Sequence, residues 1–163
     1  MEAKKLLECL GGEKGTEFLQ KMYGKSGVEA NKERYLHVME GFEKNFGSRD
    51  IKLFTSAGRT EISGNHTDHN HGKVLAGSIN LDCVAAAAAN GTDEIHIISE
   101  TFDQRFTIDI KNLAPSEKKA GTVDLTKGMV KGFLDMGYQI GGFDAFITSN
   151  VISAAGVSSS ASY

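Results

Sequence analysis

The sequence lacks the features that mark several common classes of protein. Among its 163 residues no apolar run approaches the roughly 20 residues that a membrane-spanning helix needs, so we expect no membrane span. No block of basic residues occurs, and no aromatic residues are interleaved with basic ones, so nothing predicts a nucleic-acid partner. Charged residues interrupt the apolar positions near the N-terminus, and a secretory signal is therefore not expected there.

Cysteine and proline are also scarce, with two residues and one residue respectively. Cys9 and Cys83 are far apart and unpatterned, so we expect a reduced, cytoplasmic setting in which both are buried as small apolar side chains. Pro115 falls within a polar connection. The remaining composition, 40% hydrophobic and 24% charged with a formal net charge of −3, is typical of a soluble globular protein, and the length fits one domain over 1–163.

Apolar residues at helical spacing predict helices in the first 47 residues. Leucine and aromatic stripes over 3–23 predict one or two helices. A stronger helix is expected over 28–46, beginning at the capping box of Ser26 and Glu29 and ending at Gly47. Its apolar side chains are expected to pack in the core: Tyr35, Leu36, Met39, Phe42 and Phe46.

Strand-length segments then follow at 51–56, 73–79, 82–89, 94–99, 105–110 and 143–149. Residues 82–89 are rich in alanine, which favours a helix. The Asn90-Gly91 pair is a strong hairpin signal, however, so we expect 82–89 to be a strand that pairs with 94–99. A last helix is expected over 123–137, ending at Gly137, with an apolar face made by Leu125, Met129, Val130, Phe133 and Leu134. Strands and helices that do not strictly alternate predict an α+β fold with a mixed sheet.

Residues 57–80 gather chemically capable side chains between two of the predicted strands. Asn65 and Asp68 can hydrogen-bond hydroxyl groups, and His66 can donate, accept or carry charge near neutral pH. Arg59 is fixed positive and suits phosphate or developing negative charge. On a loop held by buried strands, these groups suit a ligand with hydroxyls and a phosphate. The alternative is a polar surface loop in which the same residue types only serve turns.

A second polar segment, residues 154–160 (AAGVSSS), follows the predicted strand over 143–149. A strand, a small-residue turn and a helix start together point backbone N–H groups at a phosphate, and serine hydroxyls can add hydrogen bonds or reach Mg²⁺. No Gly-Lys-Ser/Thr follows, so the segment is not a Walker A loop. A small-residue helix start that merely packs on a sheet would look the same.

Metal binding is a further alternative for the first segment. His66-x-Asp68-His69 matches the second half of the H-x-H-x-D-H signature of dinuclear metallo-hydrolases, but Gly64 stands where the first histidine belongs. His71 adds another candidate ligand, and no distant cluster completes a closed site.

Taken together, the two segments resemble motifs of the galactokinase branch of the GHMP small-molecule kinases. The family's first motif runs approximately G-R-x-N-x-x-G-E-H-x-D-Y-N, and this chain reads GRTEISGNHTDHN over 58–70. The second runs approximately P-x-G-x-G-L-S-S-S-A-S, and this chain reads ISAAGVSSSAS over 152–162. Two separated motifs in the right order are much more specific than either motif alone.

The resemblance implies ATP-dependent phosphorylation of the anomeric hydroxyl of galactose, with Mg²⁺. It also implies a ribosomal protein S5 domain 2-like α+β fold, with helices packed on one face of a mixed or antiparallel sheet and a helical N-terminal extension over 1–47. By position, Arg59 resembles the arginine that braces the transferring phosphoryl group. The sugar-binding positions correspond to Asn65, His66, Thr67 and Asp68. The ATP phosphate loop corresponds to Ala154, Ala155, Gly156, Val157, Ser158, Ser159 and Ser160, of which Ser160 also ligates Mg²⁺.

The chain departs from the family motifs at several positions. Glu61 replaces Asn, Asn65 replaces Glu, His69 replaces Tyr, Ile152 replaces Pro and Ala154 replaces Gly. An amide at position 65 exchanges a charge-assisted hydrogen bond to the sugar for a neutral one. Alanine at position 154 adopts positive φ less readily than glycine.

In the family, the catalytic aspartate, a second Mg²⁺ carboxylate and a C-terminal domain lie beyond the second motif, whereas this sequence ends at Tyr163. We therefore expect an N-terminal fragment that has no kinase activity by itself. The face that the C-terminal domain would cover is expected to be apolar and to promote self-association. The alternative function is a non-catalytic sensor of galactose and ATP built on the same fold.

Overall fold

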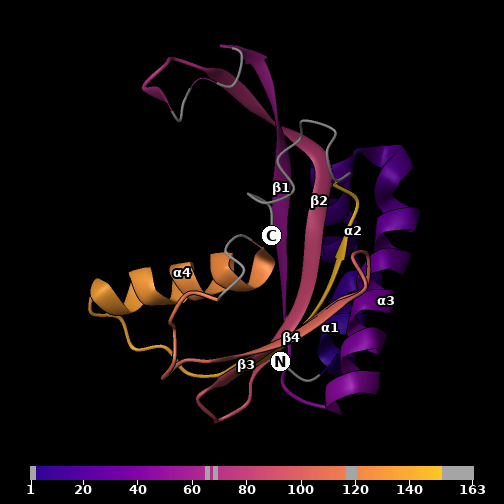
Figure 1. Ribbon diagram of the computed structural model, residues 1–163. Coiled ribbons are helices and arrows are strands. Elements are labelled where there is room, and N and C mark those ends of the chain that lie inside the picture. Colours follow the sequence, from indigo (N-terminus) through magenta and orange to yellow (C-terminus); the bar gives the residue numbers. More distant parts are fainter. Residues whose placement is uncertain (1–2, 65–66, 68–69, 117–120, 152–163) are drawn as a thin grey trace.

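The computed structural model describes residues 3–64, 67, 70–116 and 121–151, which form four α-helices, one 3₁₀ turn and five strands in this part of the chain (Figure 1). The helices are α1 (Ala3–Gly11), α2 (Glu13–Tyr23), α3 (Val28–Phe46) and α4 (Thr122–Asp135), and the 3₁₀ turn is Lys25–Gly27. The strands are β1 (Lys52–Ser63), β2 (Leu75–Ala89), β3 (Glu94–Ser99), β4 (Gln104–Asp109) and β5 (Phe143–Ser149). The predicted α+β fold with a mixed sheet is confirmed.

The five strands form one sheet in the order β1-β2-β5-β3-β4. All neighbouring pairs are antiparallel except β3 with β5, which is parallel. The predicted hairpin between 82–89 and 94–99 is therefore wrong, because β5 lies between these two strands. The Asn90-Gly91 turn opens around the start of β5: the Asn90 amide donates to the Gly142 carbonyl, and the Gly142 amide donates to the Thr92 carbonyl.

The alanine-rich segment forms a strand as predicted, within the 15 residues of β2. It pairs with β1 on one side and β5 on the other, and both of its faces are covered. Val84, Ala86 and Ala88 pack in the cluster that includes α3, whereas Cys83 packs in the cluster that includes α4. Pairing and burial on both sides outweigh the local preference of alanine for helix.

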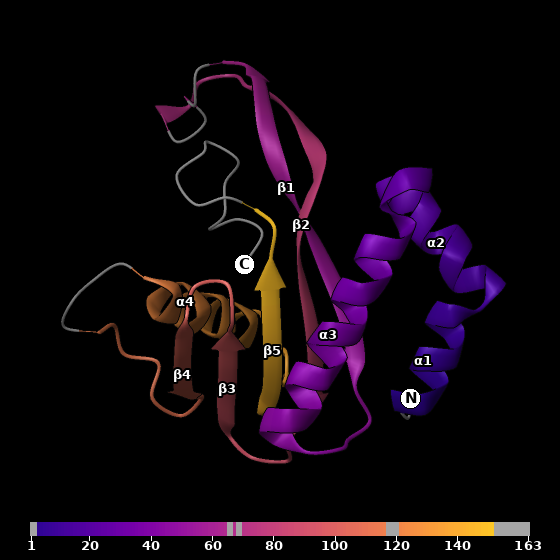
Figure 2. The same ribbon diagram turned by 90° about the vertical axis from the view of Figure 1, so that its right-hand side faces the viewer.

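Helices cover both faces of the sheet, so the expectation of helices on one face is wrong (Figures 1 and 2). The N-terminal helices α1–α3 lie against one face, where Val38, Met39 and Phe42 of α3 are buried with Phe146 of β5. Helix α4 lies on the other face. The apolar side chains of α3 therefore form one core with this face of the sheet.

Helix α4 buries far less than its sequence predicts. Only Thr126 and Val130 are buried, and the Val130 side chain packs with Ile97 and Ile108. The other side chains of the predicted core face are exposed: Leu125, Met129, Phe133 and Leu134. A helix seated at one side of the sheet covers it with a narrow strip, so most of its apolar surface is left outside.

The helix ends and the two cysteines agree only in part with the sequence-based predictions. Gly47 and Gly137 follow α3 and α4 with φ of 80° and 86°, as expected for glycines that end helices. The predicted capping box is wrong, because Ser26 lies in the 3₁₀ turn and Gly27 precedes α3 with no side-chain cap. Cys83 is buried as expected, but Cys9 is exposed. Within the described ranges, no helix has the length and apolar character needed to cross a bilayer.

Candidate functional site

The β1–β2 hairpin carries the first motif. Residues 58–63 and 75–81 of these strands continue beyond the rest of the sheet as a two-stranded arm, which points away from the other strands in both views (Figures 1 and 2). Arg59 lies in this arm opposite Ser78, and not in a loop as predicted. The connecting loop is limited to 64–74, because strand pairing continues through two irregularities, after Ala57 and after Glu61.

The alternation of the arm places Arg59 and Glu61 on the same side, where both are half-buried, whereas Thr60 and Ile62, which alternate with them, are exposed. An arginine and a glutamate two positions apart on one strand side provide opposite charges on a rigid backbone. Such a pair could orient a polar ligand held at the arm.

The tip of the hairpin is a compact turn centred on Thr67. Its hydroxyl donates to the Gly64 carbonyl at 2.7 Å, and its carbonyl accepts from the amides of Asn70 and Gly72 at 3.0 and 2.8 Å. Gly64 has a φ of 117°, and a Cβ atom at Gly72 would lie 2.0 Å from the Thr67 hydroxyl oxygen. The backbone therefore favours glycine at both positions, of which Gly64 is a glycine of the motif and Gly72 lies two residues beyond it.

The other predicted sugar-binding residues, Asn65, His66 and Asp68, lie outside the described residues, as does all of 154–160. Their roles remain predictions. The described residues contain no group of three His, Cys, Asp or Glu side chains that could hold a metal ion, and His66, Asp68 and His69 of the metal alternative are not among them.

The strand that leads to the second motif ends at the base of the arm. The Asn150 amide donates to the Asp82 carbonyl at 3.0 Å, and the Val151 amide donates to the Ser149 hydroxyl at 3.1 Å. The Thr101 hydroxyl accepts a hydrogen bond from the Ser149 amide at 2.8 Å. The chain therefore leaves β5 in a fixed direction beside β2.

A buried polar group, which we call the Asp82 cluster, lies at this junction: Asp82, Arg34, Tyr23 and Thr55. The Asp82 carboxylate accepts hydrogen bonds from the Arg34 guanidinium and from the hydroxyls of Tyr23 and Thr55. Burial, together with the bonds to Asp82 and Tyr35, raises the pKa of Tyr23 far above its usual value, so this hydroxyl stays protonated. Sequence reasoning missed the cluster, although an aspartate at the head of an apolar strand signals a buried charge that needs a partner.

A second buried carboxylate, Asp144, lies near the opposite end of β5. It accepts from Arg49 Nη1 at 2.6 Å, His96 Nδ1 at 2.6 Å and Asn90 Nδ2 at 3.0 Å. We call these four residues the Asp144 cluster. Burial alone raises the pKa of Asp144, but the bonds from Asn90 and His96 and the charge of Arg49 outweigh it and lower the pKa below its usual value.

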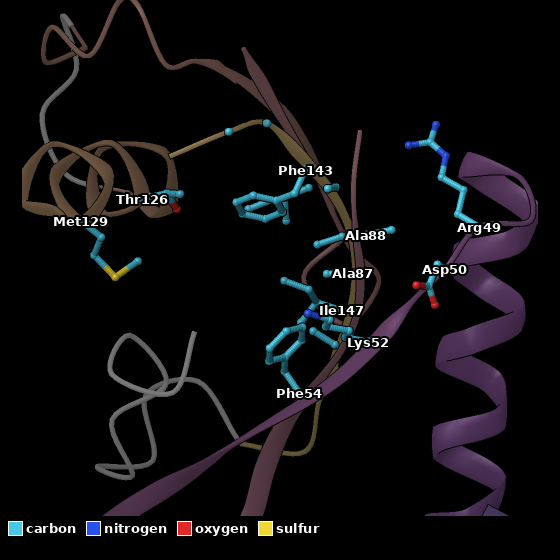
Figure 3. Close-up of a pocket in the computed structure, with 16 residues that line it drawn as sticks. Arg49, Asp50, Lys52, Phe54, Ala87, Ala88, Thr126, Met129, Phe143 and Ile147 are labelled. Atoms are coloured by element: carbon cyan, nitrogen blue, oxygen red, sulfur yellow. The ribbon is translucent and has the colours of Figure 1, made fainter. Parts of the chain in front are cut away.

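A groove of about 780 Å³ lies between α4 and the sheet. Figure 3 shows Met129 of α4, Phe143 of β5 and Phe54 of β1 directed toward the same space. Its floor includes small side chains of β2 such as Ala85 and Ala87, and neither Arg59 nor Thr67, the two predicted site residues that the structure describes, lines it. Arg49, Asp50, Lys52 and Thr126 also line the groove, and the rest of its lining is apolar or glycine.

Comparisons with known proteins point to one family. Residues 40–89, which include the end of α3 and the β1–β2 hairpin, match the galactokinase galactose-binding signature. The chain is 31% identical to a galactokinase of Clostridium tetani over 74% of this chain and 31% of the relative. It is 34% identical to a galactokinase of Lactococcus lactis subsp. lactis over 77% of this chain and 32% of the relative.

Solved structures give the same result. The fold is similar to the crystal structure of Lactococcus lactis galactokinase complexed with galactose, with a TM-score of 0.65 and 32% identity over 76% of this chain and 32% of that chain. It is also similar to Methanococcus jannaschii mevalonate kinase, with a TM-score of 0.56 and 17% identity over 69% of this chain and 37% of that chain, a likeness that shows the fold alone. The chain thus spans about a third of the length of the relatives that it matches.

Proposed function

Because the chain is related to the galactokinases, we propose that it is the N-terminal part of an ATP-dependent kinase that phosphorylates the anomeric hydroxyl of galactose. The observation that carries this proposal is the match of 40–89 to the galactose-binding signature, since that range includes the hairpin with its compact Thr67 turn. The fold is proposed to be ribosomal protein S5 domain 2-like, and 1–163 is proposed to form one domain of a longer protein.

The proposed roles divide the chemistry between two segments. Asn65, His66, Thr67 and Asp68 bind the hydroxyl groups of galactose, and Arg59 stabilises charge on the transferring phosphoryl group. Residues 154–160 bind the ATP phosphates through backbone amides and serine hydroxyls, and Ser160 ligates Mg²⁺. A set of hydroxyls and successive amides is a suitable donor set for a triphosphate and its hard cation, which neutralises charge during transfer.

Catalysis is proposed to need the part of the protein that the relatives carry beyond this region. We propose that the 163-residue chain has no kinase activity alone. The exposed apolar side of α4 and the adjoining groove are proposed as the face that the remaining part of the parent protein covers. Both cysteines are free, which is consistent with the predicted cytoplasmic setting. No observation favours the non-catalytic sensor, and we do not propose it.

The test compares Asp68→Ala with the wild type in the full-length parent. Calorimetry is expected to show a large loss of galactose affinity, because a carboxylate that accepts from sugar hydroxyls is removed, and unchanged ATP affinity. The matched control is Asp135→Ala, which removes an exposed carboxylate that contacts only Lys131 among the described hydrogen bonds and should leave both affinities unchanged. Unchanged galactose affinity in Asp68→Ala, or galactose-dependent ADP production by the 163-residue chain, would contradict these assignments.

A further inference from the structure

We propose that Asp82 is a positioning residue, which holds the hairpin arm and the exit of β5 at Asn150 in one fixed geometry. The inference rests on the proposed function for its biological meaning, because the arm and the exit of β5 lead into the segments that are proposed to bind sugar and phosphate. Its structural content depends only on contacts of the described residues.

Asp82 lies where β2 changes from pairing with two neighbouring strands to pairing with one. Below it, β2 pairs with both β1 and β5, and the last pair with β5 is Cys83 with Ser149. Above it, β2 pairs with β1 alone. A two-stranded ribbon is marginally stable in water and twists easily, so the direction of the arm depends on how its base is held.

The strand register is also interrupted at this point. Ala57 pairs with Asp82, whereas the next partners are Arg59 and Ser78. The β1 residues are two positions apart and their β2 partners are four apart, so β2 bulges directly above Asp82. A bulge bends a strand and redirects the side chains beyond it, Arg59 included. The residue that anchors the bulge therefore sets where the arm points.

The Asp82 side chain ties this junction to three other elements. Its partners come from the end of α2 (Tyr23), from α3 (Arg34) and from β1 (Thr55). The Arg34 guanidinium also lies 5.6 Å from the centre of the Tyr23 ring. Through these contacts the base of the arm is fixed to the helical layer, whereas strand pairing alone would fix it only to its neighbours.

The Asp82 backbone holds the exit of β5. Its carbonyl accepts the Asn150 amide, one residue beyond β5 and four residues before Ala154. One residue thus contacts the arm through its strand pair, the helices through its carboxylate and the exit of β5 through its carbonyl. Displacing Asp82 would therefore move the arm relative to the exit of β5.

The energetics favour a geometric role over a stabilising one. The side chains of Asp82 and Arg34 are 3% and 13% exposed, and Nε and Nη1 of Arg34 have no hydrogen-bond partner among the described residues. Removing such charges from water is costly, and apolar residues of similar size commonly replace a buried ion pair without loss of stability. The adjacent positions of β2 are Leu81 and Cys83, followed by Val84, so this part of the strand is otherwise apolar.

The experiment replaces the ion pair with apolar side chains, in the double variant Arg34→Met, Asp82→Leu. Amide hydrogen exchange measured by NMR is expected to accelerate roughly tenfold or more for Asn150 and for the arm, at 58–63 and 75–81, while the α3 amides stay protected. The matched control is Arg49→Met, Asp144→Leu, which removes the ion pair of the other buried carboxylate, at the far end of β5, and should leave the arm and Asn150 unchanged.

Milder variants keep the proposal testable if the double variant does not fold. Tyr23→Phe and Thr55→Val each delete one hydrogen bond to Asp82, and each should accelerate the same amides to a smaller extent. The proposal is overturned if folded variants exchange at Asn150 and the arm as the wild type does, or if the Asp144 control changes these amides equally.

A separate binding measurement keeps this inference distinct from the proposed function. Galactose titrated into the wild-type chain and the Arg34→Met, Asp82→Leu variant is expected to bind the variant roughly tenfold or more weakly. If the wild-type chain binds no galactose, the proposed function loses its support in this fragment, and the exchange data still decide whether Asp82 positions the arm and the exit of β5.

Discussion

Gly41 shows how one residue sets the distance between α3 and the sheet. A Cβ atom at this position would lie 2.3 Å from a ring carbon of Phe146, so only glycine lets the helix approach β5 this closely. Glycine inside a helix costs about 1 kcal/mol relative to alanine. The close packing with Phe146 must outweigh that cost.

We predict that Gly41→Ala destabilises the protein by about 1–3 kcal/mol, although it raises helix propensity, because the added methyl group overpacks the core. Urea unfolding followed by circular dichroism measures the change. The control is Gly128→Ala in α4, where a Cβ atom would meet nothing within 4 Å, and which should stabilise by about 1 kcal/mol. Equal effects of the two substitutions would show that packing against Phe146 does not decide the choice of glycine.

The same scale marks a limit of sequence reasoning. Asp82 and Asp144 each lie in an apolar strand segment, and their burial could be anticipated from that pattern. Their partners could not, because 18 lysines and arginines were available and Arg34 and Arg49 lie 48 and 95 positions away. A buried charge indicates that a partner exists, but it does not identify the partner residue.

At the scale of elements, the start of β5 is held to the end of β2 and to β3 by the Asp144 cluster. The hydrogen bond to Asp144 raises the pKa of His96 above its ordinary value, with smaller help from Glu94, while burial acts in the opposite direction. The protonated ring is therefore bound more favourably in the folded protein than in the unfolded chain. His96 contributes stability that is complete below its unfolded pKa of about 6.5 and is lost as the pH rises through its folded pKa.

We predict that the free energy of unfolding of the wild type includes a component that falls as the pH rises above about 6.5. His96→Gln should remove this component, because glutamine carries no titrating proton. Denaturant unfolding at a series of pH values measures the slope. Asp144→Asn should remove the same component, and the double variant should remove no more than either single change, since both act through one contact. A His96→Gln variant with the wild-type slope would contradict the assignment.

The elements themselves were largely predictable, and their pairing was not. Alternating Phe106, Ile108 and Ile110 mark β4, and the apolar stripe of α3 marks its buried face, because periodicity is a local property. The Asn90-Gly91 turn is equally local, and it suggested a hairpin. Nothing near that turn reveals that a strand about 50 positions later inserts between the two strands that the turn connects. Strand order is decided by contacts across the whole chain.

At the scale of the whole molecule, the proposed function requires the hairpin motif and the serine-rich segment to lie close together. Among the described residues, the end of β5 lies at the base of the arm, where the Asn150 amide contacts the Asp82 carbonyl. Residues 152–163 are outside the described part of the chain. That part of the arrangement follows from the position of β5 beside β2, which the sequence did not indicate. The meeting of the two motifs remains a prediction.

The outer side of α4 bears on how the chain behaves alone. Leu125, Met129, Phe133 and Met136 recur at helical spacing with 39%, 44%, 48% and 65% of their surface exposed. Met129 joins this stripe to the apolar groove beside β5. A continuous apolar surface of this kind is unusual on a monomer and marks a site of association.

We predict that the 163-residue chain self-associates in a concentration-dependent manner through this surface, and that Met129→Lys, Phe133→Lys shifts it to monomer, as measured by sedimentation velocity. Two lysines at the centre of the stripe would have to be desolvated for two copies to pack, which costs more than the apolar contact provides. The control is Ile62→Lys, Leu75→Lys, since these side chains are 67% and 60% exposed on the arm, away from α4. If the control abolishes association and the α4 variant does not, the chain associates through the arm. The proposal that the remainder of the parent protein covers α4 then loses its physical basis.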